Sequence, residues 1–449
     1  MRRFIYFHID ELNRDAITAS VLNAELKKNG WTLIYGNRFT SKILRFFEWA
    51  FDVVILPKPA FMKAYFPTDQ IPNLVAKYVM LYTENIGVIA NYKYSKMLHR
   101  CALDPDFMEG KTAAVDKVAA FCFWGKQVAN EIKNKFPHLA NQCHVVGHPR
   151  HDKRAIKKTT LSFEQKSVGI ITRYVALNDY FVRHPMLALV SRYMTDIQYE
   201  YIHPITGDYL ISKKRGDKPD DDLILEIIDI RNTVILIKKL INHGYRVSIK
   251  IHPRENPLLW VSALDGLDVE IADSAQTFAE WALRQRCVIG PPSTSFYDCL
   301  MLNIQPISIA NLDSMRSKFV NEIYEENNRL TPYVIAPYTF DGVLSEVKNL
   351  NGNLVLDEKI VEVLDAEANF PKCETSITEL RLVLEKVLLN SLPRKFSRDI
   401  GICIYVLTSY LLNLVGYVYS KVVHKNVNSA LFFLTFTTIR KIDKMIHVE

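Results

Sequence analysis

Two segments of the chain place polar side chains directly after an apolar run that is typical of a strand. In VSIKIHPREN, residues 247–256, the apolar run is followed by His252, Pro253, Arg254 and Glu255. The proline fixes the turn and stops the hydrogen-bond ladder of the strand. Because open α/β sheets bind ligands at the carboxyl ends of their strands, His252 is a candidate ligand contact. A plain strand-end turn with solvated Arg254 and Glu255 explains the same spacing.

The second segment, CVIGPPSTSFYDCLMLN, repeats this arrangement at residues 287–303. A strand is expected to end at Gly290, and two prolines shape the turn that follows. Ser293, Thr294 and Ser295 then open a helix. Free N–H groups at a helix start, together with hydroxyls, form an anion site suited to a phosphate. An ordinary helix cap needs only one hydroxyl, so three in succession favour the phosphate site.

Carboxylates and a histidine elsewhere are further candidates. Asp229 lies within the helical run LEIIDIRN, Glu84 follows a strand in LYTEN, and His8 and Asp10 end the first strand. A carboxylate at the edge of a cleft could act as a nucleophile or a base. The alternative for each acid is a solvated residue or a partner of a nearby cation.

The elements that must position these residues alternate between strand and helix. In the first half, strands are expected within residues 2–10, 31–37, 51–59, 77–85, 118–125 and 143–152, with helices between them. Apolar strands joined by helices predict a parallel sheet covered on both faces. Residues 1–152 therefore form one Rossmann-like domain.

The pattern restarts after a polar, basic linker at residues 153–166. A long helix is expected over 220–244, where acids 220–222 favour its start and Gly244 ends it. Strands at 167–174, 246–253, 268–273, 286–290 and 305–310 complete a second Rossmann-like domain, residues 165–350. Residues 355–449 are expected to be a separate helical segment. The class is α/β, and we expect a cleft between the two domains.

Composition and motifs exclude several protein classes. The 449 residues are 49% hydrophobic and 23% charged, which is typical of a globular chain of two domains. The seven cysteines include no C-x-x-C pair, so we expect reduced core cysteines in a cytosolic protein. The first ten residues read as a strand and not as a signal peptide. The sequence lacks G-x-G-x-x-G and a P-loop, which argues against nicotinamide dehydrogenases and P-loop ATPases.

The C-terminal region differs from the rest. Residues 400–420 carry no charge, and residues 394–449 hold eight Lys or Arg against three Asp or Glu, a net charge of +5. The rest of the chain is close to neutral. An uncharged run flanked by cations predicts a helix on an anionic membrane surface. The alternatives are a helix packed on the domains and a true span.

The motifs FHID, TEN, VVGHPRHD, IKIHPRE and GPPSTS, taken in this order, resemble those of bacterial surface-carbohydrate biosynthesis proteins. The chain looks most like the retaining β-Kdo glycosyltransferases, which add 3-deoxy-D-manno-oct-2-ulosonic acid (Kdo) to O-antigen or capsule chains. The resemblance covers roughly residues 1–350, and it does not extend to the tail.

This resemblance implies a GT-B-like enzyme with CMP-β-Kdo as donor and no metal or other cofactor. Its His-Pro pair, here His252 and Pro253, would lie against CMP, and Ser293–Ser295 would hold the phosphate. Asp229 would carry the sugar adduct, and Glu84 would be its acid/base partner. Residues 1–152 would bind the acceptor.

The sugar carboxylate has four cationic candidates, although a surface cation is the alternative for each: Arg173, Arg231, Lys250 and Arg254. The expected partners are a lipid-linked glycan acceptor and, through the tail, the inner face of the cytoplasmic membrane; nucleic acid is not expected. Two alternatives stay open. One is a polyol-phosphate or other nucleotide-sugar transferase, and the other is a non-catalytic glycan-assembly subunit.

Overall fold

The computed structural model describes residues 3–9, 12–37, 40–82, 104–156, 161–174, 177–178, 200–202, 209–211, 219–253, 255–273, 276–312, 333–389 and 396–423. The chain divides into two compact units. Unit 1 comprises Met1–Ile156 and Val361–Glu449, and unit 2 comprises Lys157–Ile360.

Unit 1 is built on a parallel sheet in the order β2-β1-β3-β4-β5-β6. Its strands are β1 (Arg3–His8), β2 (Trp31–Gly36), β3 (Val53–Leu56), β4 (Lys77–Leu81), β5 (Val118–Phe123) and β6 (Cys143–Val145). From β1 the chain moves outward to β2 and then returns to β3 on the other side of β1. The order of the sheet therefore reverses between β1 and β3, and such a switch point is where α/β sheets bind ligands.

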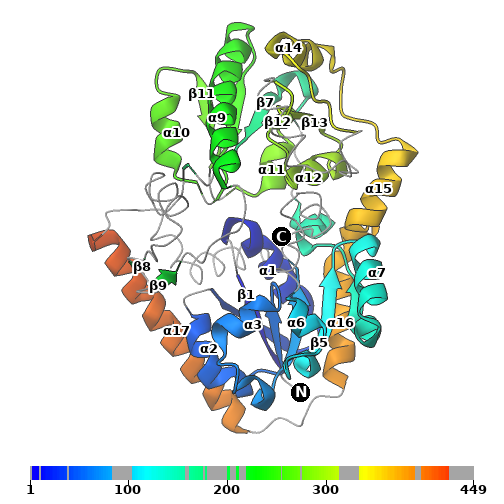
Figure 1. The fold of residues 1–449 in the computed structure, drawn as a ribbon, viewed down its shortest axis with the longest axis vertical. Coiled ribbons are helices and arrows are strands. Elements are labelled where there is room, and N and C mark those ends of the chain that lie inside the picture. The colour runs from blue at the N-terminus through cyan, green and yellow to red at the C-terminus, as the bar shows by residue number, and fades with distance from the viewer. Residues whose placement is uncertain are drawn as a thin grey trace. The chain divides into compact units, whose positions relative to one another are not determined.

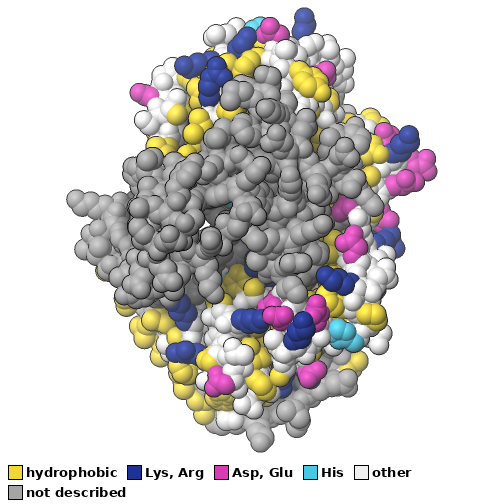
Figure 2. Space-filling view, in the orientation of Figure 1, with side chains coloured by type: hydrophobic (Ala, Val, Ile, Leu, Met, Phe, Trp, Pro, Cys, Tyr) yellow, Lys and Arg dark blue, Asp and Glu magenta, His cyan; other side chains and the backbone are white. Residues whose placement is uncertain are grey.

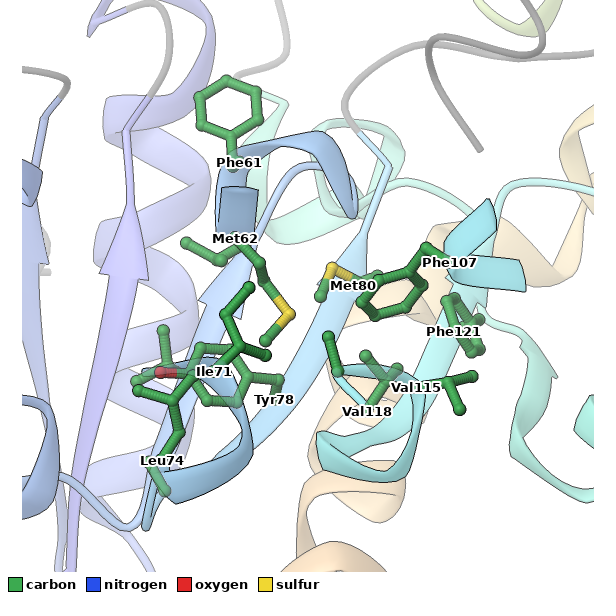
Figure 3. Packing of buried hydrophobic residues seen from close by; sticks show 14 of the residues in the cluster. Phe61, Met62, Ile71, Leu74, Tyr78, Met80, Phe107, Val115, Val118 and Phe121 are labelled. Atoms are coloured by element: carbon green, nitrogen blue, oxygen red, sulfur yellow. The ribbon is translucent and has the colours of Figure 1, made fainter. Parts of the chain in front are cut away.

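Helices and apolar clusters cover the faces of this sheet. The helices before the linker are α1 (Leu12–Lys27), α2 (Ser41–Phe47), α3 (Ala60–Tyr65), α6 (Pro105–Met108) and α7 (Lys126–Lys135), with a 3-10 turn η1 (Glu48–Ala50). Because strand side chains alternate, Tyr6 enters one buried cluster and Ile5 and Phe7 enter the other. Figure 3 shows the first cluster, in which Met80 of β4 and Phe121 of β5 pack beside Phe107.

The C-terminal helices belong to the same unit. They are α15 (Glu358–Ala368), α16 (Ser376–Leu389) and α17 (Phe396–Val423). Ile377 and Leu380 of α16 enter the cluster around Ile5, and Tyr405 of α17 enters the cluster around Tyr6. In Figure 1, α17 is the long helix that runs beside α2. The sequence pattern treats residues 355–449 as a separate segment, but the apolar faces of α16 and α17 find their cover on the first sheet.

Unit 2 contains a second parallel sheet, in the order β11-β10-β7-β12-β13. The strands are β7 (Ser167–Ile171), β10 (Val247–Lys250), β11 (Val269–Ile271), β12 (Gln285–Gly290) and β13 (Gln305–Ser308). The helices are α9 (Pro219–Asn242), α10 (Pro257–Ala263), α11 (Phe278–Ala282), α12 (Ser295–Met301) and α14 (Phe340–Asn349), and β8 (Glu200–Ile202) pairs with β9 (Tyr209–Ile211). The switch point lies between β7 and β12.

The expected fold class is confirmed: this is an α/β chain with two Rossmann-like sheets and C-terminal helices. The long helix expected over 220–244 is α9, and Gly244 follows it with a left-handed φ of 81°. Both sheets bring their strand ends to one edge, so each unit has its own candidate site.

Candidate functional site

The switch point of unit 2 joins the loops that follow β7 and β12. Arg173 Nη1 donates to the carbonyl oxygen of Pro292 at 3.1 Å. The two strands approach closely here, because a Cβ on Gly290 would collide with Ile171. The glycine that ends the strand in IGPPSTS is therefore a steric requirement of the edge. The exposed Arg173 lies beside the predicted phosphate loop.

His252 follows the next strand in the sheet, β10, which pairs with β7. Its backbone N–H donates to Thr172 Oγ1 at 2.9 Å, and its side chain is half-buried. The Thr172 hydroxyl also hydrogen-bonds the carboxylate of Glu255. Thr172 thereby fixes the turn that carries His252, and no motif in the sequence pointed to it.

The buried side chain of Glu255 holds together the loop after β7 and the loop after β10. Its carboxylate accepts from the Tyr174 backbone N–H at 2.9 Å and from Trp260 Nε1 at 2.7 Å, and only 2% of the residue is exposed. Burial raises the pKa of this carboxyl group, and the hydrogen bonds oppose the rise. The interpretation of Glu255 as a solvated turn residue is wrong. In the sequence, Trp260, five residues later, is the one sign that Glu255 could be buried, because an indole N–H can donate to a buried carboxylate.

The Ser-Thr-Ser segment lies at the start of α12, as predicted. Ser293 Oγ accepts from the Ser295 backbone N–H at 3.2 Å, and all three residues are half-buried. Thr294 holds the N-cap position but makes no side-chain cap bond. One hydroxyl of the three therefore serves the local turn. An anion at this edge could use the others.

Asp229 lies on the face of α9 that meets the loop after β7. The Tyr174 hydroxyl hydrogen-bonds Thr233 Oγ1 at 2.7 Å and lies 3.5 Å from the Asp229 carbonyl oxygen. Asp229 and its neighbour Asn232 are both buried, and Asn232 Nδ2 has no hydrogen-bond partner. This contact uses the backbone carbonyl oxygen of Asp229, so it places that turn of α9 beside Tyr174, the residue after Arg173, and does not fix the direction of the carboxylate.

The cation candidates occupy different environments. Lys250 is half-buried, and its Nζ donates to the carbonyl oxygens of Asp273 at 2.8 Å and Gln276 at 2.5 Å. Burial lowers the pKa of this lysine to about 8. Arg231 is exposed on α9. Lys250 therefore holds the loop between β11 and α11. Arg173, two residues after the end of β7, is the cation candidate that lies at the switch point. Arg254, Glu84 and Asp10 lie outside the described residues.

Unit 1 forms a narrow hollow at its own switch point, with an interior volume of about 10 Å³, which is room for about one water molecule. The strands on both sides of the switch contribute His8, Leu56 and Pro57, and α1 contributes Asp15 and Thr18. The remaining lining residues are Phe7, Ile55, Leu81 and His148. Thr18 Oγ1 is buried and has no hydrogen-bond partner among the described residues, so a ligand hydroxyl could engage it. In the sequence, His8 and the motif VVGHPRHD, which contains His148, are the signals that mark this lining, because Asp15 and Thr18 look like ordinary helix residues.

The hydrogen bonds of His8 indicate that its Nδ1 carries a proton. Ser41 Oγ donates to the Asn37 carbonyl oxygen at 2.6 Å, which uses the only proton of that hydroxyl. His8 Nδ1 lies 3.0 Å from Ser41 Oγ and must therefore be the donor. The neutral ring then has an unprotonated Nε2, which has a long 3.4 Å contact with the Tyr65 hydroxyl. A basic nitrogen at a switch point can accept a proton.

His148 has the opposite arrangement. Its Nδ1 accepts from the Arg150 backbone N–H at 3.1 Å, so its neutral ring carries the proton on Nε2. The loop is held by α16, where Ser376 Oγ donates to the His148 carbonyl oxygen at 3.1 Å. Gly147, with φ of 73°, lies against Cys373 without room for a Cβ. The hollow thus has one basic and one donating imidazole, and the second depends on a C-terminal helix.

Among the described residues, no group of three His, Cys, Asp or Glu side chains could hold a metal ion. Whether turnover needs a metal stays a prediction. The structure therefore offers a candidate proton acceptor in the hollow of unit 1 and a candidate anion site at the edge of unit 2.

No protein-family model matches the chain, and no curated protein matches it. Solved structures do show similarity. The Staphylococcus aureus MnaA–UDP structure has 12% identity and a TM-score of 0.47, with 88% of this chain and 98% of that chain covered. A structure of the wall teichoic acid polymerase TagF has 12% identity and a TM-score of 0.48, with coverage of 86% and 89%. The Methanocaldococcus jannaschii UDP-GlcNAc 2-epimerase with UDP-GlcNAc and UDP has 10% identity and a TM-score of 0.45, with coverage of 86% and 100%.

Proposed function

We propose that the chain is a glycosyltransferase that takes its sugar from a nucleotide donor. The observation that carries this proposal is the edge of unit 2. There, three neighbouring strand ends place Arg173, His252 and Ser293–Ser295 around one switch point. This combination of a cation, an imidazole and hydroxyls suits the phosphate and base of a nucleotide.

The edge also suits the leaving group of the reaction. Departure of a nucleotide leaves negative charge on a phosphate, and fixed donors stabilise such charge without a metal. Backbone N–H groups at the start of α12, the serine and threonine hydroxyls and Arg173 can supply these donors. The helix has only seven residues, so the side chains contribute more than its dipole.

The hollow of unit 1 supports a role in acceptor activation. A sugar hydroxyl becomes a better nucleophile when a base removes its proton, and His8 Nε2, which contacts the Tyr65 hydroxyl at 3.4 Å, is the candidate base. The Thr18 hydroxyl, which no described residue hydrogen-bonds, could orient the same group. Glu84 stays a candidate for the acid/base role that the resemblance assigns to it.

In its specific form, the proposal is Kdo transfer from CMP-β-Kdo to a lipid-linked surface glycan. Retention would proceed through an adduct on Asp229, which requires a carboxylate within bonding reach of the anomeric carbon. This role is supported by the resemblance and by the position of the α9 turn that carries Asp229, whose backbone carbonyl contacts Tyr174, next to Arg173 in the chain. A second candidate is transfer of a polyol phosphate from a cytidine diphosphate donor. The same phosphate edge would serve it, and no adduct would form.

Release of free nucleotide tests these alternatives. Purified chain is incubated with an acceptor glycan and either CMP-Kdo or CDP-glycerol, with and without EDTA. CMP release from CMP-Kdo, unaffected by EDTA, together with a Kdo adduct on Asp229 by mass spectrometry, supports the specific form. CMP release from CDP-glycerol alone supports the second candidate. If neither CMP nor UDP binds unit 2 by calorimetry, the transferase proposal is wrong.

A further inference from the structure

Helix α17 presents a row of apolar side chains to solvent. The outer stripe consists of eight residues whose exposed fractions lie between 47% and 64%: Ile400, Ile404, Leu407, Tyr410, Leu411, Leu414, Val415 and Val418. Most members follow one another at intervals of three or four residues, so they share one face of the helix. An exposed apolar patch of this length marks an interaction surface.

The opposite face of α17 is fastened to unit 1. Tyr405 is fully buried, and Gly401 lies so close to η1 that a Cβ would touch Trp49 and Ala50. Asn37 Nδ2 donates to Asn413 Oδ1 at 3.2 Å. A helix that crossed a bilayer would have to break these contacts and expose the cluster around Tyr6. The structure therefore favours a helix that stays packed on its domain, although α17 is long and apolar enough to span.

Neighbouring elements extend the stripe. Phe46 of α2 and Trp49 of η1 are 58% and 38% exposed, and both elements pack against α17. Figure 2 shows hydrophobic side chains along the lower left of the view, where Figure 1 shows α17 and α2. Tryptophan and tyrosine rings are enriched where proteins meet the membrane–water interface.

Charge indicates which partner covers this surface. Lys42 and Arg45 are exposed on α2, and that helix carries no acid. Residues 400–420 have no charge, and residues 394–449 have a net charge of +5. An apolar face beside cations fits an anionic lipid surface, where tails accept the apolar groups and headgroups attract the cations.

We propose that the outer stripe of α17, with Phe46, Trp49, Lys42 and Arg45, is a membrane-docking face on which unit 1 lies with α17 parallel to the bilayer. The face binds bilayers that contain anionic lipid, and α17 remains bound to its domain. Docking places unit 1 and its hollow next to the membrane surface, where a lipid-linked acceptor would be found. The docking itself does not depend on transferase activity.

Flotation of the full chain with lipid vesicles tests this inference. Wild-type protein is expected to float with vesicles of phosphatidylcholine and phosphatidylglycerol. The double variant Leu407→Glu, Leu411→Glu is expected to lose this binding by at least about tenfold, because two charges enter the apolar layer. Lys42→Gln with Arg45→Gln is expected to lose on the order of tenfold on the anionic vesicles. Neither pair should change the melting temperature, since all four side chains are exposed.

The matched control is Leu382→Glu with Leu389→Glu, two exposed apolar residues of α16, which enters the other buried cluster of unit 1; this variant should float like wild type. Flotation of Leu407→Glu, Leu411→Glu at wild-type levels would overturn the proposal. So would a wild-type protein that ignores vesicles but forms a dimer that this variant abolishes, because the partner would then be a second copy. A protein that floats only after residues 424–449 are removed would show that its own C-terminal segment covers the stripe. A nucleotide affinity equal to wild type in all variants separates this result from the transferase proposal.

Discussion

The two switch points differ in how they hold their polar groups. In unit 1 the sheet edge closes into a hollow, and His8, Asp15 and Thr18 are each no more than 3% exposed. In unit 2 the corresponding edge is open, and His252 and Ser293–Ser295 are only half-buried. In the buried hollow, the hydrogen bonds of His8 indicate a proton on Nδ1. An open edge instead leaves donors for an anion that arrives with its own charge.

The support for the two edges also comes from different parts of the chain. Unit 2 holds its loops with Glu255, a buried carboxylate three residues beyond His252. Unit 1 holds the His148 loop with α16, more than 220 residues further along the chain. A histidine at a strand end can therefore be positioned by residues close to it in the sequence or by residues far from it in the sequence. Sequence spacing reveals only the local kind.

The largest effect is expected from His8→Asn. The asparagine amide can still donate to Ser41 Oγ in place of Nδ1, but the basic Nε2 is lost. If the hollow handles protons, turnover should fall by roughly 10²–10⁴-fold. Nucleotide affinity should stay unchanged by calorimetry, because His8 belongs to the other unit. Full turnover of this variant would show that His8 transfers no proton, and the hollow of unit 1 would then have no chemical role that the edge of unit 2 lacks.

Glu255→Ala is expected to be the next largest. The Tyr174 backbone N–H and Trp260 Nε1 would both lose their buried acceptor, at a cost of roughly 2–5 kcal/mol in the free energy of unfolding. Urea unfolding followed by tryptophan fluorescence measures this loss. Glu255→Gln keeps one carbonyl oxygen and should lose clearly less. Equal losses would mean that shape, and not hydrogen bonding, supports the open edge.

His252→Ala should weaken CMP binding by about 1–3 kcal/mol, the value of one hydrogen bond to a charged group. Isothermal calorimetry gives the affinity, and the melting temperature checks that unit 2 is still folded. His148→Gln in unit 1 is the matched control and should leave CMP affinity as in wild type. If the control weakens CMP binding as much as His252→Ala, the nucleotide is not confined to the open edge.

The smallest effect is a pH dependence in unit 2. The folded pKa of Lys250 is about 8, below its ordinary value near 10.5, so the unfolded chain binds more protons between these values. Stability from this lysine therefore rises as pH increases above 8, and the penalty is fully present below pH 8. Lys250→Met should abolish that rise. Urea midpoints of both proteins at pH 7.5 and pH 9.5 would show it, and parallel changes would contradict the assignment.

Much of the fold could be predicted because apolar periodicity reports local burial. The long helix before Gly244 and the strands before His252 and Ser293 lie where their patterns indicate. Thr172, Thr18 and Asp15 could not be predicted as site residues, since their role depends on which strands and helices become neighbours. The outer stripe illustrates the same limit: residues 400–420 are uniformly apolar, so only the packing of Tyr405 and Asn413 separates an inner face from an outer one.

The discontinuity of unit 1 has a consequence for synthesis on the ribosome. The first sheet is made early, yet its clusters include Ile377, Leu380, Ile402 and Tyr405, which emerge only after all of unit 2. At ordinary elongation rates the nascent sheet waits on the order of tens of seconds for these residues. During that interval its apolar faces are open to chaperones or to other nascent chains. Unit 2 is continuous and can fold while unit 1 still waits, so the order in which the units mature is the reverse of the order in which they begin.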